Sequence, residues 1–227
     1  MTITYHPEVV QGSDEWHQMR CGMLTASEMK LILTPTLKLA SNDKERAHIW
    51  ELASQRVTQY VEPSYIGDNM LRGWDDEILA RDLYSKTYAP VVETGFVTND
   101  RLGFPIGYSP DGLVGDDGLI ECKSRKQKFQ VETIAAGTVP DEFMLQLQTG
   151  LIVTERKWVD FISYSGGLPM VVIRVEPIDE YQDAIIEAAT KFEARIAERL
   201  SQYRAAVFAD GARLVPTERK IQEEIYV

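Results

Sequence analysis

The chain has 227 residues, of which 44% are apolar and 26% are charged, and this is the balance of an ordinary globular protein. The composition excludes intrinsic disorder and collagen-like repeats, and no stretch approaches the roughly 18 uninterrupted apolar residues of a membrane-spanning helix. The N-terminus lacks the basic and apolar regions of a signal peptide, so we expect a cytoplasmic protein with no membrane association. Two cysteines, Cys21 and Cys122, are too few for a disulfide framework or a Cys-rich metal site, and we expect buried free thiols.

The chain is acidic, with 24 Lys and Arg against 35 Asp and Glu and a formal net charge of −11. Long-range repulsion between an acidic protein and a polyanion argues against nucleic-acid binding. Net charge is a sum over the whole molecule, however, so an acidic surface around a basic groove is still compatible with a DNA enzyme.

The N-terminal third of the chain favours helices. Ser13 is a candidate N-cap for a short helix over 14–20, and Thr25 or Ser27 is a candidate N-cap for the next one. Longer helices are predicted over about 42–60 and 70–86, where apolar residues recur at helical spacing.

Strand-like alternation follows in the middle of the chain, and helical patterns then return. Strands are predicted over 91–98, 104–109 and 118–123, helices over 126–136 and 141–153, and two more strands over 157–165 and 169–177 with a Gly166-Gly167 turn between them. A long amphipathic helix from 178 to 207 is expected to pack against the sheet. With no repeat or linker, the order predicts one domain over residues 1–227, of the α/β class, with a central mixed β-sheet flanked by helices.

The most informative stretch is SPDG (109–112) followed by GLIECK (118–123). Side chains alternate along a strand, so Glu121 and Lys123 share one face, and a hairpin would bring Asp111 level with Glu121. Two carboxylates offer the oxygen ligands that Mg²⁺ prefers, and a lysine beside such an ion can hold or deprotonate an attacking water. This arrangement is typical of metal-assisted phosphodiester hydrolysis.

An Asp with a nearby Glu-x-Lys also arises by chance as a surface charge cluster. Two features favour a site: Glu121 and Lys123 stand within an apolar run, where an unpaired carboxylate is costly, and Ser-Pro-Asp-Gly is a defined turn.

Pro-Asp followed by Glu-x-Lys is the PD-(D/E)xK nuclease signature, and the chain resembles the phage lambda exonuclease-like family of alkaline exonucleases. The blocks WHQMR (16–20) and GMLTASE (22–28) resemble the N-terminal motif of that family, Gly73 with Glu77 resembles its glutamate-bearing helix, and QLQ (146–148) resembles its Q-x-Q helix. The blocks follow the family's order over about residues 10 to 160, and the resemblance implies a restriction-endonuclease-like core.

The resemblance also implies roles for individual residues. Asp111 and Glu121 would bind two Mg²⁺ ions, for which Mn²⁺ can substitute, together with the backbone carbonyl of Cys122. Lys123 would orient or activate the nucleophilic water, and Glu77 would assist from its helix, with Gln148 nearby. The residues that would hold the 5′-phosphate and contact DNA are Arg20, Ser27 and Thr25.

Two further DNA contacts are expected. The run from Lys123 to Lys128 is the densest basic segment, and we interpret Arg125, Lys126 and Lys128 as tracking the DNA backbone, although such runs are more often solvated. The family's apolar wedge, which splits the terminal base pairs, aligns with Met70. That residue is flexible and unbranched, so Leu71 is an alternative.

Members of this family digest one strand of linear double-stranded DNA from its 5′ end and leave a 3′ overhang. The resemblance therefore implies a phage or prophage recombination exonuclease, a ring-shaped homotrimer and a single-strand annealing protein as partner. Two alternatives are a PD-(D/E)xK endonuclease of the restriction or RecB type and a non-catalytic DNA-end-binding module.

Overall fold

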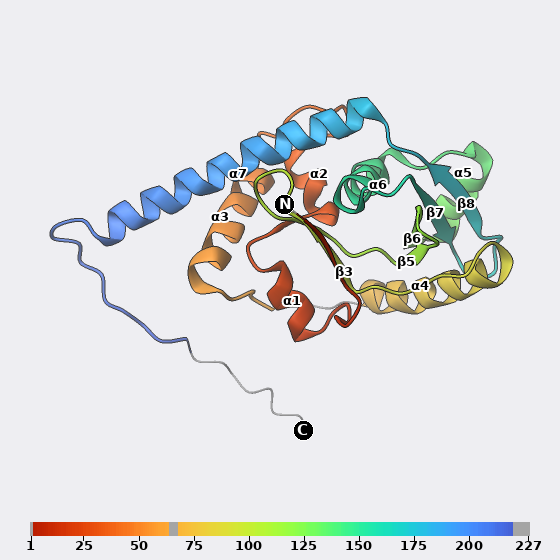
Figure 1. The fold of residues 1–227 in the computed structure, drawn as a ribbon, viewed down its shortest axis with the longest axis horizontal. Helices are drawn as coiled ribbons and strands as arrows, with labels where there is room; N and C mark the ends of the chain where they lie inside the picture. Colours follow the sequence, from red (N-terminus) through yellow and green to blue (C-terminus); the bar gives the residue numbers. More distant parts are fainter. Residues whose placement is uncertain (1, 64–67, 220–227) are drawn as a thin grey trace, which may run out of the picture.

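The protein is described here by a computed structural model that covers residues 2–63 and 68–219, with the side chains of 68–70 outside the description. Figure 1 shows helices arranged around two groups of strands. In chain order the elements are β1 (Ile3–His6), α1 (Asp14–Arg20), β2 (Leu24–Thr25), the 3₁₀ helix η1 (Ala26–Glu28), α2 (Met29–Ile32), α3 (Asp43–Thr58), α4 (Asp68–Thr87), β3 (Phe96–Asn99), β4 (Ile106–Tyr108), β5 (Gly112–Val114), β6 (Gly118–Ser124), α5 (Gln127–Ala136), α6 (Asp141–Thr154), β7 (Trp158–Tyr164), β8 (Val171–Val175) and α7 (Asp179–Val207).

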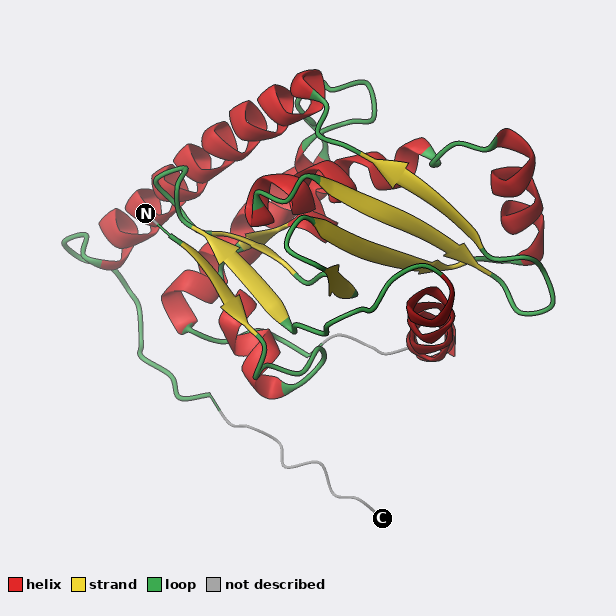
Figure 2. Cartoon of the chain, turned by 45° about the vertical axis from the view of Figure 1, so that its right-hand side comes forward, coloured by secondary structure: helices red, strands yellow, loops and turns green. Residues whose placement is uncertain are grey.

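The predicted mixed α/β class is confirmed, but the strands form two four-stranded mixed sheets rather than one central sheet. The first sheet has the order β1-β3-β4-β2 and the second β5-β6-β7-β8. Figure 2 shows the two groups of yellow strands side by side, the first sheet to the left of the second. The chain crosses from the first sheet to the second between Tyr108 and Gly112, where Pro110 has no N–H to donate to a ladder. Asp111 lies at this crossing.

Helix α6 joins the two sheets into one hydrophobic core. It packs against β3 and β4 of the first sheet and against β7 of the second. Its buried residues include Leu147 and Leu151, and a Cβ on its Gly150 would meet the ring of Tyr108 at 2.8 Å. A larger residue at Gly150 would therefore push α6 away from β4. This close approach brings the α6 side chains near to the end of β4.

Helix α4 packs against the other face of the second sheet. Ala80 and Tyr84 are buried in a smaller cluster with Ile120, Cys122 and Ile162. The hydroxyl of Tyr84 donates a hydrogen bond of 2.6 Å to Asp160 on β7, which also accepts two from Arg174. These contacts fix the position of α4 relative to β6.

The prediction that the last helix packs on the sheet is wrong in part, because α7 packs chiefly on α3, α6 and α2. Its buried residues end at Ile196, and Tyr203 is exposed, so the C-terminal end of the helix projects from the body (Figure 1). No helix among the described residues is both long and apolar enough to cross a membrane.

Both predicted N-caps are confirmed: Ser13 accepts a hydrogen bond from the Trp16 N–H at the start of α1, and Thr25 caps η1. Asn42, which was not predicted as a cap, accepts a hydrogen bond from the Glu45 N–H at the start of α3. The short strands β1, β2 and β5 were not predicted, and the strand expected over 91–98 begins only at Phe96.

Candidate active site

The β5–β6 hairpin brings Asp111 and Glu121 together. Gly112 pairs with Ile120, so Asp111 lies opposite Glu121 in the continuation of the register. The Asp111 carboxylate accepts a hydrogen bond of 2.5 Å from the backbone N–H of Cys122. Asp111 is 9% exposed and Glu121 is 2% exposed. The structure therefore brings these two carboxylates to the predicted spot.

Glu121 is held by three side chains from three elements. Its Oε1 accepts hydrogen bonds of 2.6 Å from Lys123 Nζ on the same strand and from Gln146 Nε2 on α6, and its Oε2 accepts one of 2.6 Å from the Tyr108 hydroxyl on β4. Sequence reasoning missed Tyr108 and assigned no role to Gln146. Both sheets and α6 thus contribute to the position of one carboxylate.

Glu77 on α4 is the third carboxylate of the cluster. Burial raises its pKa from 4.5 to about 7, and the negative charge of Glu121 contributes to the rise, although Lys123 opposes it. Burial also raises the pKa of Asp111 well above its ordinary value, and Glu121 and Glu77 raise it further. Burial is the main cause of both shifts, and the close approach of the carboxylates adds to it.

Lys123 is the cation of the cluster. Burial alone would lower the pKa of its amine, but the charges of Glu121 and Asp111 outweigh this effect and raise the pKa above its ordinary value. In the metal-free cluster the amine is therefore favoured as an ammonium, which donates hydrogen bonds.

The fit of a divalent cation depends on these oxygens. Among the residues that the structure describes, no three His, Cys, Asp or Glu side chains stand in a geometry that would hold a metal ion. Mg²⁺ needs only one or two carboxylates, since water and phosphate complete its shell, and Asp111, Glu121 and Glu77 offer carboxylate oxygens at one place. The donor set therefore fits Mg²⁺, provided that Lys123 or Gln146 releases Oε1 of Glu121.

One predicted site residue, Gln148, has another position. Gln148 does not reach the carboxylates: its amide donates to the Glu176 carbonyl at 2.8 Å and accepts from the Ile178 N–H at 3.0 Å, so it ties α6 to the start of α7. The residue of the Q-x-Q pair that contacts Glu121 is Gln146. The Cys122 thiol points into the core on the other face of β6, as expected for a buried free cysteine, whereas the free thiol of Cys21 is partly exposed.

Arg20, Thr25 and Ser27 form a second cluster beside β4. A guanidinium N–H of Arg20 donates to the Thr25 hydroxyl at 3.1 Å, and the Thr25 and Ser27 hydroxyl oxygens lie 3.3 Å apart. The guanidinium lies over the ring of Trp16, 4.1 Å from its centroid. Burial lowers the pKa of Arg20, and the charge of Glu28 partly offsets this effect.

The two clusters are neighbours. The indole N–H of Trp16 donates a hydrogen bond of 2.8 Å to the hydroxyl of Ser109, two residues before Asp111. Thr25 pairs with Gly107, next to Tyr108, which reaches Glu121. The predicted phosphate-binding residues therefore lie beside the carboxylates, although 91 residues of sequence separate Arg20 from Asp111.

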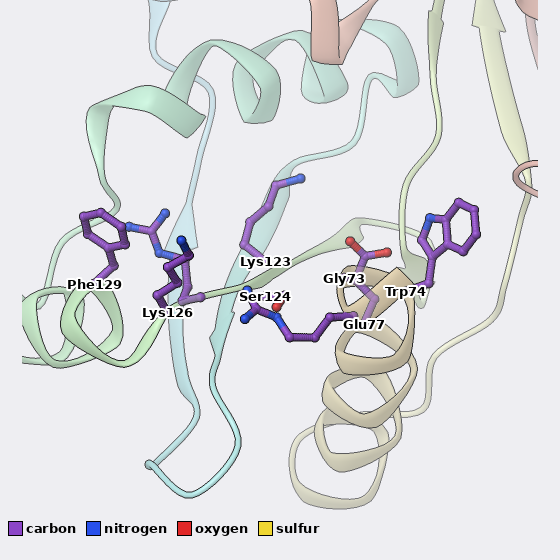
Figure 3. A pocket seen from close by; sticks show the side chains of 9 residues that line it. Gly73, Trp74, Glu77, Lys123, Ser124, Lys126 and Phe129 are labelled. Atoms are coloured by element: carbon purple, nitrogen blue, oxygen red, sulfur yellow. The ribbon is translucent and has the colours of Figure 1, made fainter. Parts of the chain in front are cut away.

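Two cavities flank the acidic cluster, and both are lined by Trp74 and Glu77 of α4. The first cavity, of about 400 Å³, opens toward α5, and the second cavity, of about 430 Å³, opens toward the segment after β1. Figure 3 shows the first cavity. It is lined by Arg72, Gly73, Trp74, Glu77, Lys123, Ser124, Arg125, Lys126 and Phe129. The lining of the second cavity includes Asp111, Arg81, Ile78, Val9 and Gln11.

The basic run does not act as one free patch. Arg125 is largely buried, pairs with Glu142 at 2.8 Å and lies over the rings of Phe129 and Phe143. Lys126 and Lys128 are exposed. Arg72 is a further cation of the first cavity that sequence reasoning missed, although its position one turn before Asp76 and Glu77 could have pointed to it.

The candidate wedge residues lie at the start of α4. The side chain of Met70 is outside the described part of the structure. Leu71 is 48% exposed.

Comparisons with known proteins give consistent matches. A family model described as a YqaJ-like viral recombinase domain matches residues 15–157. The crystal structure of an alkaline exonuclease from Laribacter hongkongensis, LHK-Exo, is similar with 32% identity and a TM-score of 0.71, over 86% of this chain and 100% of that chain. The same protein in complex with dAMP matches with 33% identity, the same TM-score of 0.71 and the same coverage, 86% and 100%.

A more distant structure supports the fold alone. A phage-related exonuclease from Haemophilus somnus has 13% identity and a TM-score of 0.58, over 80% of this chain and 96% of that chain. No curated protein sequence matches the chain.

Proposed function

The chain belongs to the family of YqaJ-like viral recombinase domains, and from this premise we propose that it hydrolyses linear double-stranded DNA with Mg²⁺, from the 5′ end, leaving a 3′ single strand. Its membership and its likeness to an alkaline exonuclease identify it as a DNA-degrading hydrolase, and an exonuclease.

The observation that carries the proposal is the convergence of three acidic side chains and one lysine at the crossing between the sheets. Asp111 and Glu121 would hold two Mg²⁺ ions, or Mn²⁺, with the carbonyl of Cys122, and Glu77 would reach them from α4. Bound there, the metal would polarise the scissile phosphate and stabilise both the attacking and the leaving oxygen.

The side chains would divide the remaining work. Lys123, as an ammonium, would donate hydrogen bonds to the attacking water or to a phosphate oxygen and so orient them. Glu77, which lies beside Lys123 and Glu121, would assist a metal or accept a proton from that water. Gln146 and Tyr108 would keep the carboxylate of Glu121 in place.

The second cluster supports the proposed polarity. A guanidinium binds phosphate oxygens through paired donors, and Arg20 is held in one orientation by Trp16 and Thr25. With Ser27 it would hold a terminal 5′-phosphate beside the carboxylates, so that cleavage begins at the 5′ end. The exposed lysines, Lys126 and Lys128, would contact the DNA backbone.

The assembly forms part of the same proposal. From the family resemblance we include a homotrimeric ring around the DNA, a single-strand annealing protein as partner, a single domain over residues 1–227 and a place in phage-type recombination. The molar mass of the protein by light scattering tests the ring, since a monomer has 25.7 kDa and a trimer about three times as much.

The experiment that tests the activity compares two DNA forms. End-labelled linear duplex should be degraded from the 5′ end with Mg²⁺ and left intact with EDTA, while covalently closed circles should resist. Cleavage of closed circles would indicate the endonuclease alternative. Binding to DNA ends without any cleavage would indicate the non-catalytic module.

A further inference from the structure

Trp74 is an exposed aromatic residue one helical turn from Glu77. It is 43% exposed and stands three positions before Glu77 on α4, so the two side chains are neighbours on the helix surface. It lines both the first and the second cavity. In Figure 3 the carboxylate of Glu77 lies between the Trp74 indole and the Lys123 amine. The indole therefore borders the space in which the chemistry is proposed to occur.

Trp74 differs from the other three tryptophans in its contacts. Trp16 lies under Arg20 at 4.1 Å, Trp158 lies under Arg174 at 3.6 Å, and Trp50 is 5.8 Å from Arg199. Within the described ranges, no cation or aromatic ring lies against Trp74, and its indole N–H has no hydrogen-bond partner. The indole is 43% exposed and borders both cavities, so part of its surface is accessible to another planar group.

We propose that Trp74 is the stacking residue for a nucleobase of the bound DNA strand, next to the phosphate that is cleaved; this rests on the proposed function. Aromatic side chains bind bases of any sequence because every base has a π-face. An indole is the largest such surface in proteins. Trp74 would therefore hold the base while the carboxylates act on the phosphate.

The charge distribution favours a nucleic-acid strand over a protein partner. The first cavity carries Arg72, Lys123 and Lys126, which suit a chain of phosphates, and it meets the indole along α4. A strand that places a phosphate among these cations has its bases directed away from them. Leu71 and Ile78, exposed by 48% and 49%, extend an apolar stripe on either side of Trp74, so a second copy of the chain is the competing occupant.

The test is a double-mutant cycle that combines a substitution in the protein with the removal of one base from the DNA. Duplexes with one abasic nucleotide at each of the first few positions from the 5′ end are compared in single-turnover digestion with Mg²⁺ and in equilibrium binding with EDTA. Trp74→Leu should lower the rate or affinity about 5- to 150-fold on normal DNA, the range expected for one lost stack. Trp74→Phe should keep most of the wild-type rate and affinity, because the smaller ring still stacks.

The decisive result is the coupling at one position. At the position of the stacked base, an abasic nucleotide should lower the rate or affinity of the wild type about as much as Trp74→Leu does on normal DNA. The same abasic nucleotide should lower the rate or affinity of Trp74→Leu only a little further. Trp50→Leu is the matched control, since Trp50 is an exposed tryptophan, 51% accessible, on α3 and lines neither cavity. It should behave as the wild type.

Two results would overturn the inference. One is an equal effect of Trp74→Leu on DNA with and without a base at every position. The other is a change in the molar mass of Trp74→Leu but not of Trp50→Leu, which would assign the stripe to a protein interface. If the wild type binds DNA with the predicted coupling but cleaves nothing, the proposed function fails and the stacking role stands.

Discussion

The acidic cluster predicts that replacing Glu77 by glutamine stabilises the metal-free protein at alkaline pH while impairing its activity. The pKa of Glu77 rises from 4.5 to about 7 on folding, chiefly because the side chain is buried. The folded state holds this proton more tightly than the unfolded state. The contribution of Glu77 to the free energy of unfolding is therefore fully present below pH 4.5 and is lost as the pH rises through 7. The Glu77→Gln variant has no charge at this position and escapes the loss.

The size of the effect follows from the two pKa values. The difference between pKa values of 4.5 and about 7 lowers the free energy of unfolding by at most about 3 kcal/mol at pH 8. At pH 5, where Glu77 of the unfolded chain is already mostly ionised, the loss is about 1 kcal/mol. For a chain of this length, about 3 kcal/mol raises Tm by roughly 6 to 12 °C.

Urea denaturation with EDTA at pH 5 and pH 8 measures the effect directly. Asp75→Asn is the matched control, because Asp75 is an exposed carboxylate on the same helix. Mg²⁺ should stabilise the wild type more than Glu77→Gln at pH 8, because the ion replaces the missing positive charge. A Glu77→Gln variant that is less stable than the wild type at pH 8, or that has the same pH dependence, would refute the reasoning.

Three more predictions concern activity. Glu121→Ala should lower the cleavage rate by orders of magnitude while DNA binding in EDTA persists, and near-normal turnover would contradict the metal-site assignment. Arg20→Ala should slow digestion of 5′-phosphorylated ends more than that of 5′-hydroxyl ends; an equal effect on both substrates would remove its role in phosphate binding. Raising the salt concentration should weaken DNA binding steeply, because Lys126 and similar side chains release counterions from phosphates, and a flat salt profile would argue against a basic channel.

The core of the site could be predicted because its geometry is local. Alternation along β6 places Glu121 and Lys123 on one face, and an adjacent hairpin strand sets Asp111 opposite Glu121. No long-range contact is needed for that conclusion. Glu77 was indicated only by resemblance, because nothing in the pattern of α4 shows which sheet it packs against.

Gln146 and Gln148 show what such patterns miss. They are two residues apart and so lie about 200° apart around the helix. Because α6 is buried by both sheets and by α7, its apolar residues cover most of its circumference and mark no single face. Only the tertiary structure shows that Gln146 reaches Glu121 while Gln148 ties α6 to the start of α7.

The division into two sheets was missed for a similar reason. The strands β2 and β5 have two and three residues, too few for a period to be read. Strand β2 pairs with β4 in the first sheet, and β5 pairs with β6 in the second, so the two sheets divide at Pro110. At this division Tyr108 and Gln146 reach Glu121.

Binding of Mn²⁺, followed by electron paramagnetic resonance, examines the acidic pocket most directly. Wild-type protein with duplex DNA should bind two ions, while Asp111→Asn and Glu121→Gln should bind fewer and more weakly. Unchanged stoichiometry and affinity in both variants would mean that these carboxylates do not hold the catalytic metal.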